Sequence, residues 1–108
     1  MRTFARGTTI DFTIVFYDPD AEVAEPDSAI IMIAYPDKGW PQNGDDLKTE
    51  EIALTLVPAD GSWTGSWSTS VSQPGVVYWS TVASDAALTT ENGNFRLTGN
   101  PANLIAIP

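Results

Sequence analysis

The sequence predicts an all-β protein, and three observations indicate this class. Several short segments alternate apolar and polar residues with a period of two, as strands with one buried face do. Pairs of turn-forming residues lie between these segments, namely Asp60-Gly61, Pro74-Gly75 and Asn92-Gly93. No segment has the apolar spacing and the capping residues of an amphipathic helix. The chain has 108 residues, which is enough for one domain with one hydrophobic core.

The first half of the chain contains two predicted strands of different character. In residues 10–16, large apolar side chains fall on alternate positions, which predicts a strand with one apolar face. An Asp-Pro-Asp turn at residues 18–20 ends it, because proline cannot donate a hydrogen bond to a sheet. Residues 28–35 are almost continuously apolar and rich in β-branched isoleucine, which favours a strand buried on both faces. A long polar loop is expected over residues 36–46.

The second half of the chain contains four further predicted strands, at residues 52–56, 63–69, 76–83 and 94–98. Six or seven short strands, each bounded by turn residues, predict an immunoglobulin-like β-sandwich of about seven antiparallel strands. We expect one such domain over residues 1–108. The two segments outside the sandwich, residues 1–7 and 99–108, are candidate docking arms.

Charge and composition restrict the function. The net charge is −9, from 14 acidic and 5 basic residues, and such a field repels a phosphate backbone, so nucleic-acid binding is not expected. The chain has no cysteine and so can form neither a disulfide nor a thiolate metal site. Asp11 interrupts the stretch where a secretion signal would be most apolar, and the longest apolar run, residues 29–34, is too short to span a bilayer. We therefore expect no secretion signal and no membrane partner.

The residues for common catalytic mechanisms are missing. There is no histidine, so neither a Ser–His nor a Cys–His pair can form. The two lysines, Lys38 and Lys48, lie in or beside the polar loop, where the burial that lowers a lysine pKa is not expected. Carboxylate pairs for glycoside hydrolysis are compatible with so many acidic residues but are expected by chance. The prediction is a protein that is not an enzyme.

An acidic cluster between the first two strands makes Asp18, Asp20 and Asp27 speculative calcium ligands, because Ca²⁺ prefers oxygen ligands. The segment does not match an EF-hand loop, since Val23 stands at the glycine position and Ala29 at the position of the bidentate glutamate. A solvated acidic rim is the favoured interpretation. No other cofactor is expected. A second acidic group that could approach the first consists of Asp45, Asp46, Glu50 and Glu51.

The tryptophans allow two interpretations. Trp63 and Trp67 share strand parity with Gly65 between them, so both indoles lie on one face and could stack on sugar rings, or could equally belong to the core. Trp79 is predicted to be core, and it could oppose Trp67 across the loop that contains Pro74-Gly75 if that loop sets the right register. Trp40, in the polar loop, is either an exposed anchor for a protein partner or a lid over the sandwich edge.

The two candidate arms hold the other predicted contacts with a protein partner. Leu104, Ile105 and Ile107 make the last segment too apolar for a free tail, so it is expected to dock on a neighbour or on its own domain. Phe4, between Arg2 and Arg6, belongs either to a docking arm or to a first edge strand.

From Thr9 to Thr98 the arrangement resembles the small immunoglobulin-like virion accessory proteins of tailed bacteriophages. The resemblance rests on four stretches, Phe12-Thr13-Ile14-Val15-Phe16-Tyr17-Asp18-Pro19-Asp20, Glu25-Pro26-Asp27-Ser28, Ala59-Asp60-Gly61-Ser62-Trp63 and Gln73-Pro74-Gly75-Val76-Val77-Tyr78-Trp79. The chain departs from the family pattern after Asp20, where Ala21 and Glu22 stand in a turn that usually carries glycine.

The resemblance implies a non-enzymatic structural protein, made in the host cytoplasm and located in the virion as a capsid decoration, head–tail or tail component. Its partners would be capsid or tail proteins, or further copies of the chain. The alternative is a recognition module that binds carbohydrate or calcium through its loops.

Overall fold

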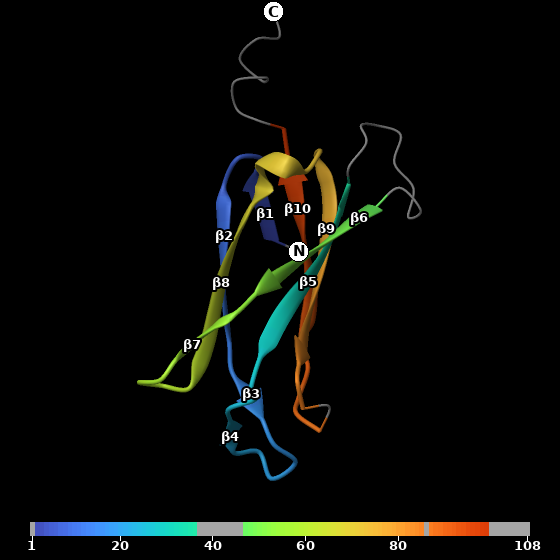
Figure 1. The fold of residues 1–108 in the computed structure, drawn as a ribbon. Coiled ribbons are helices and arrows are strands. Elements are labelled where there is room, and N and C mark those ends of the chain that lie inside the picture. Colours follow the sequence, from blue (N-terminus) through green and yellow to red (C-terminus); the bar gives the residue numbers. More distant parts are fainter. Residues whose placement is uncertain (1, 37–46, 86, 100–108) are drawn as a thin grey trace, which may run out of the picture.

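A computed structural model describes residues 2–36, 47–85 and 87–99, and these residues form an all-β structure without an α-helix (Figure 1). A 3₁₀ turn, η2, covers Thr69–Val71. The strands are β1 (Arg2–Ala5), β2 (Thr9–Ile14), β3 (Phe16–Tyr17), β4 (Val23–Ala24), β5 (Ala29–Pro36), β6 (Leu47–Ala53), β7 (Thr55–Val57), β8 (Ser62–Ser68), β9 (Gly75–Ala83) and β10 (Asn92–Thr98). The predicted all-β class is confirmed.

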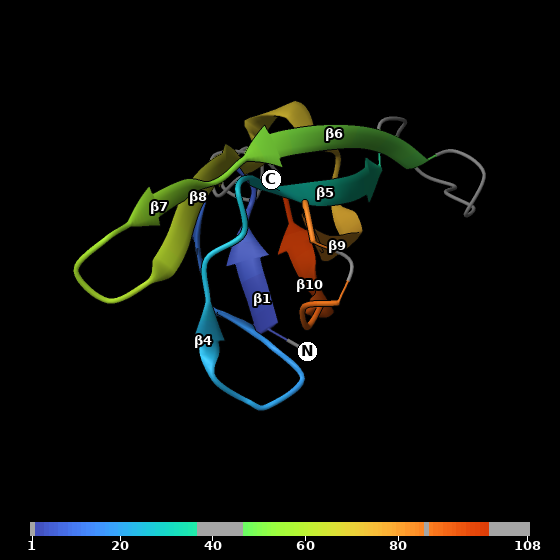
Figure 2. The same cartoon turned by 60° about the horizontal axis from the view of Figure 1, so that its bottom comes forward.

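The strands form two main sheets and a small hairpin. The larger sheet has the order β1-β10-β9-β5-β6, the smaller one has the order β2-β8-β7, and β3 pairs with β4. All paired strands are antiparallel except β1 and β10, which run parallel from the pair Arg2–Phe95 to the pair Ala5–Thr98. Figures 1 and 2 show β6 continuing into β7 as the chain passes from the larger sheet to the smaller one.

The alternation in β2 places its apolar face as predicted. Ile10, Phe12 and Ile14 are buried, and the residues between them are exposed. The inward residues of both sheets share one core, in which the ring centroids of Phe12 and Trp79 are 5.6 Å apart. The rings of Trp67 and Phe95, again from different sheets, are 6.3 Å apart. Contacts between aromatic rings therefore join the two sheets.

Strand β5 differs from the prediction that both its faces are buried. Ala29, Ile31 and Ile33 are buried, whereas Ile30 and Met32 between them are only partly covered. The second face lies on the outer side of the larger sheet, where no other described segment packs over it. The apolar run therefore forms a strand with one buried face and one apolar face that is partly open to solvent.

The segment predicted as one strand at residues 52–56 is divided between the two sheets. Up to Ala53 it pairs with β5, and from Thr55 it pairs with β8. The intervening Leu54 is buried, and its backbone N–H donates to the carbonyl oxygen of Ala29 at 2.9 Å. This single bonded residue lets the chain change sheets without losing the alternation of its apolar side chains.

The structure identifies Trp63 and Trp67 as core residues, with 5% and 2% of their surfaces exposed. The space that Gly65 leaves between them is filled by Leu54, whose Cδ2 would lie 2.8 Å from a Cβ added at Gly65. The hypothesis that the two indoles form an exposed platform for sugars is therefore wrong. Neither register considered for Trp67 and Trp79 applies, because β8 and β9 belong to different sheets and do not pair.

Two predicted turns each contain a residue in the left-handed region, a glycine in the first and an alanine in the second. Gly61 has φ of +74° in the β7–β8 connection, where the Asp60 carboxylate accepts hydrogen bonds from the N–H and the hydroxyl of Ser62. These bonds hold the pKa of Asp60 below its ordinary value. After β3, the Asp18 carboxylate accepts from the backbone N–H groups of Asp20 and Glu22, and Ala21 between them has φ of +63°.

Replacing Ala21 with glycine is expected to stabilise the protein. A Cβ in the left-handed region costs roughly 1–2 kcal/mol, and glycine removes this strain from the folded state. The greater freedom of glycine in the unfolded chain offsets about 0.4–1 kcal/mol of the stability gained in this way. A net increase of about 0.5 kcal/mol in the free energy of unfolding is therefore expected from denaturant titration. The matched control is Ala24→Gly in the extended strand β4, which should destabilise the protein. A loss of stability in Ala21→Gly would contradict the assigned turn.

Candidate functional site

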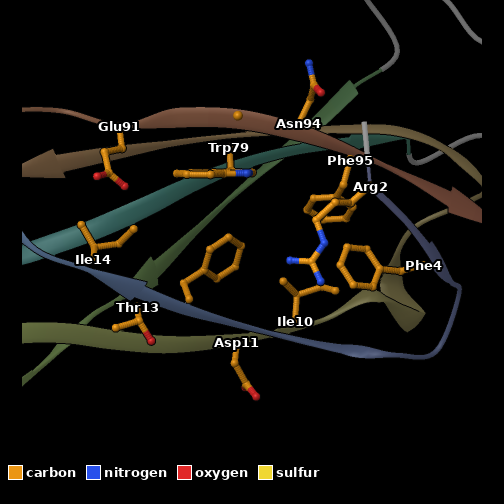
Figure 3. A pocket seen from close by; sticks show the side chains of 12 residues that line it. Arg2, Phe4, Ile10, Asp11, Thr13, Ile14, Trp79, Glu91, Asn94 and Phe95 are labelled. Atoms are coloured by element: carbon orange, nitrogen blue, oxygen red, sulfur yellow. The ribbon is translucent and has the colours of Figure 1, made fainter.

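The candidate site is a cavity of about 300 Å³ between β2 and β10, near the start of β1 (Figure 3). Its walls come from both sheets, so it lies at the side of the molecule where β2 and β1 are the outermost strands. The residues that line it are Arg2, Phe4, Ile10, Asp11, Phe12, Thr13, Ile14, Trp79, Glu91, Gly93, Asn94 and Phe95. We call it the β2–β10 groove.

One wall of the β2–β10 groove is the indole of Trp79. It lies against the backbone of Gly93, where an added Cβ would be only 2.8 Å from the ring. Figure 3 shows the indole beneath β10 with its opposite side turned towards the cavity. The absence of a side chain at Gly93 is therefore what allows the indole to lie flat under the strand and leave the cavity open.

Three further aromatic rings line the groove, those of Phe4, Phe12 and Phe95. Phe4 and Phe95 pack edge to face with ring centroids 5.5 Å apart, and the guanidinium carbon of Arg2 lies 5.0 Å from the centroid of Phe4. In Figure 3 the side chains of Asp11 and Thr13 point away from the cavity, so these two residues line it with their backbone. Arg2 and Glu91 also line the cavity, so the groove combines apolar walls with two charged side chains.

A second hollow lies on the outer face of the larger sheet, over β5 and β9, and has a volume of about 260 Å³. Exposed and partly buried apolar side chains cover this face. Tyr78 and Val82 are 48% and 46% exposed. We define the outer strip as Ile30, Met32, Ala34, Tyr78 and Val82.

Of the predicted partner-binding residues, the structure describes Phe4. Phe4 lies in β1, which pairs with β10, and its ring is partly buried against Phe95. Of the two alternatives for residues 1–7, the structure therefore shows the edge strand at Arg2–Ala5. The predicted contacts Trp40, Leu104, Ile105 and Ile107 lie outside the described residues.

The speculative calcium ligands Asp18, Asp20 and Asp27 do not come together. Among the residues that the structure describes, no group of three or more carboxylates is close enough to hold a metal ion. One carboxylate oxygen of Asp18 is already used by two backbone N–H groups of its own turn. In the second acidic group, Glu50 accepts a hydrogen bond from the indole of Trp67 at 3.0 Å, and Asp45 and Asp46 lie outside the described residues.

The residues at the centre of the β2–β10 groove were not predicted to form a site. Asn92-Gly93 was expected to be a turn before the last strand, whereas both residues belong to β10. A glycine inside a strand often marks a close approach of another group, and this signal at Gly93 could have indicated the contact with Trp79.

Comparison with known proteins assigns no family to the chain. The described residues contain no helix with the length and apolar character that a membrane crossing needs. No protein-family model matches the chain, and no curated protein matches it either.

Proposed function

We propose that this protein is a non-enzymatic structural and assembly protein of a tailed-phage virion, a capsid decoration or a head–tail or tail component. The observation that carries the assembly role is the outer strip, an apolar surface on the larger sheet that no described segment covers. The virion as its location rests on the resemblance of the turn and strand motifs. The partners would be capsid or tail proteins.

We also propose that the fold is an immunoglobulin-like β-sandwich. In that fold the strands are counted along the chain. One sheet contains the second, fifth and fourth strands side by side in that order, and the other sheet contains the third, sixth and seventh strands. The order β2-β8-β7 and the order β10-β9-β5-β6 agree with this arrangement if β6 is the additional strand that variable-type domains carry. The aromatic contacts between the inner faces of the two sheets support the same assignment.

The outer strip has the composition of a protein-binding surface. Tyr78 pairs with Ala34 and Val82 pairs with Ile30 across β9 and β5, whereas Met32 between them pairs with the polar Ser80. On its other side Met32 lies opposite Glu51 of β6. An apolar surface interspersed and bordered with polar residues is typical of protein interfaces, and tyrosine and methionine are enriched there.

The location is tested by quantitative mass spectrometry of purified phage particles from the source of the sequence. Hundreds of copies per particle would indicate a capsid decoration protein, and a few copies would indicate a tail or connector component. Finding no copies would overturn the virion assignment and would favour a recognition module that binds sugar or calcium.

The outer strip is tested by Tyr78→Lys. A charge in the centre of an apolar interface is expected to weaken attachment to the particle at least tenfold, because about 1.4 kcal/mol corresponds to a factor of ten. The stability of the free protein should change by less than about 0.5 kcal/mol, since the side chain is half exposed. The matched control is Val71→Lys in η2, an equally exposed apolar residue away from the strip, which should leave the copy number unchanged. Equal attachment of Tyr78→Lys and wild type would exclude the outer strip as the contact.

A further inference from the structure

The outer face of the larger sheet carries little charge, although the protein has a net charge of −9. Residues paired across neighbouring strands point to the same side, so the register of the sheet shows which side chains share the face of the outer strip. Among the described strand residues on this face, the charged ones are Glu51 of β6 and Arg96 of β10, and both are exposed. Their charges balance, so this face can approach a second copy of the protein without net repulsion.

The two charged residues occupy opposite corners of the face. Following the cross-strand pairs from Glu51 over β5 and β9 leads to Asn92 of β10, four residues before Arg96. Glu51 and Arg96 are therefore three strands apart across the sheet and four residues apart along it, which is about 14 Å in each direction. The midpoint between them lies at the pair formed by Ala34 and Tyr78.

A projection and a hollow lie side by side at this midpoint. The hollow of about 260 Å³ is bordered by two neighbouring cross-strand pairs, Ala34 with Tyr78 and Met32 with Ser80, and therefore lies between β5 and β9. Tyr78 stands at its border with 48% of its surface exposed. A large exposed side chain next to a hollow allows two identical faces to fit into each other.

We propose that the outer strip packs face to face on the outer strip of a second copy, in a symmetric dimer whose twofold axis passes beside the pair of Ala34 and Tyr78. Glu51 of each copy then faces Arg96 of the other, and Tyr78 of each copy enters the hollow of the other. This inference deepens the proposed assembly role and rests on it, since it identifies the partner of the outer strip as a second copy of the chain.

One twofold axis produces both contacts. It lies between the two faces, at a right angle to the line from Glu51 to Arg96, and so exchanges these two positions. Because that line extends equally far across the strands and along them, the strands of the two copies cross at about 90°, which is one of the two arrangements in which sheets pack. The same rotation places Tyr78 of the second copy between β5 and β9 on the side of Met32 and Ser80, which is the position of the hollow.

The size of the face predicts a weak dimer. The strands β10, β9, β5 and β6 together are about 19 Å wide, and two such faces crossed at a right angle overlap over a square of about this side. A contact of this size is at the lower end of specific interfaces, so the dissociation constant is expected in the micromolar range.

A dimer also strengthens attachment to a particle. It attaches to a repeating surface through two copies, and the second attachment is intramolecular, so the avidity exceeds the affinity of one copy. The loss of attachment expected for Tyr78→Lys then follows from the loss of the dimer.

The first test is sedimentation velocity of the full chain over micromolar to millimolar concentrations. Wild type is expected to pass from the 11.6 kDa monomer to a dimer and no further, because a twofold contact is closed. Tyr78→Lys should remain monomeric. Monomeric wild type at all concentrations would overturn the proposal, and so would species that continue to grow beyond the dimer.

The second test reverses the two charges. Glu51→Arg and Arg96→Glu each place like charges opposite one another twice, so each variant alone should dimerise at least tenfold more weakly than wild type. An equimolar mixture of the two variants restores two opposite-charge pairs and should form a heterodimer about as strong as the wild-type dimer. Both side chains are exposed, so the melting temperatures of the monomers should not change.

The matched control for net charge is Glu22→Arg, an exposed position between β3 and β4. It changes the net charge by the same amount as Glu51→Arg but should leave dimerisation as strong as in wild type. Undiminished dimerisation of Glu51→Arg, or a mixture of the two charge-reversed variants that stays monomeric, would contradict the proposed pairing of Glu51 with Arg96.

The dimer and the virion role can fail separately. Monomeric wild type, together with a lower copy number of Tyr78→Lys in the particle, would reject the dimer and assign the outer strip to a capsid or tail protein. A dimer that the charge reversals disrupt, together with no copies of the protein in the particle, would retain the dimer and reject the virion role.

Discussion

Replacing Trp67 with alanine is expected to lower the free energy of unfolding by about 3–5 kcal/mol. The indole is 2% exposed and packs between Tyr35 and Phe95, with ring centroids 5.4 and 6.3 Å away. It therefore contacts two strands of the larger sheet, β5 and β10, from its position in β8, and its loss leaves a cavity between the sheets. Since small domains are stable by about 5–15 kcal/mol, this variant should be partly unfolded at 37 °C. Denaturant titration followed by circular dichroism measures the loss.

The contribution of the Trp67 hydrogen bond to the free energy of unfolding can be separated from the contribution of the side-chain volume. The indole N–H donates to a carboxylate oxygen of Glu50 at 3.0 Å, which joins β8 of one sheet to β6 of the other. Trp63 is a matched comparison, because its indole is also buried but its N–H has no hydrogen-bond partner among the described residues. Tryptophan to phenylalanine removes similar volume at both sites but removes a charge-assisted hydrogen bond only at Trp67.

Trp67→Phe should therefore cost more stability than Trp63→Phe, by about 1–3 kcal/mol. Glu50→Ala should cost a similar amount, because it leaves a buried indole N–H without its acceptor. Equal losses in the two phenylalanine variants would show that the hydrogen bond to Glu50 contributes nothing. A change below about 0.5 kcal/mol in Trp67→Ala, as expected for a surface residue, would contradict the core position itself.

The sequence predicts those features of the fold that local patterns determine. The alternation of Ile10, Phe12 and Ile14 identifies both the strand and its buried face, because strand side chains alternate strictly between the two sides. The Asp60-Gly61 turn is likewise recognised from its own residues, since the φ of +74° at Gly61 suits glycine. Such features depend on the sterics and hydrogen bonding of neighbouring residues, so the partner strand does not have to be known.

Features that depend on the partner strand could not be predicted. The sequence shows that Trp63 and Trp67 share a face, but whether that face is core or surface depends on the sheet that packs against β8. The division of one predicted strand at Leu54 has the same origin, because pairing with β5 and then with β8 is decided by distant residues. The groove also depends on a distant partner, since the pairing of β10 with β9 places Gly93 opposite Trp79.

The contact between Gly93 and Trp79 supplies a sharp test of the groove geometry, because a single methyl group should disturb it. Gly93→Ala would place a Cβ 2.8–2.9 Å from three atoms of the Trp79 indole, well inside van der Waals contact. The rigid ring cannot yield by rotating one bond at its end, so the indole must shift as a whole into the cavity. Overpacking of this kind costs about 1–3 kcal/mol, and the reduced freedom of alanine in the unfolded chain offsets about 0.4–1 kcal/mol.

Two other glycines serve as controls for the Gly93→Ala prediction. In Gly65→Ala the nearest atom is the Cδ2 methyl of Leu54, which can rotate away, so the loss of stability should be smaller. In Gly99→Ala no atom lies within 4 Å of the new Cβ, and stability should be unchanged. Unchanged stability in Gly93→Ala would refute the contact, because the contact requires the indole to lie flat beneath β10.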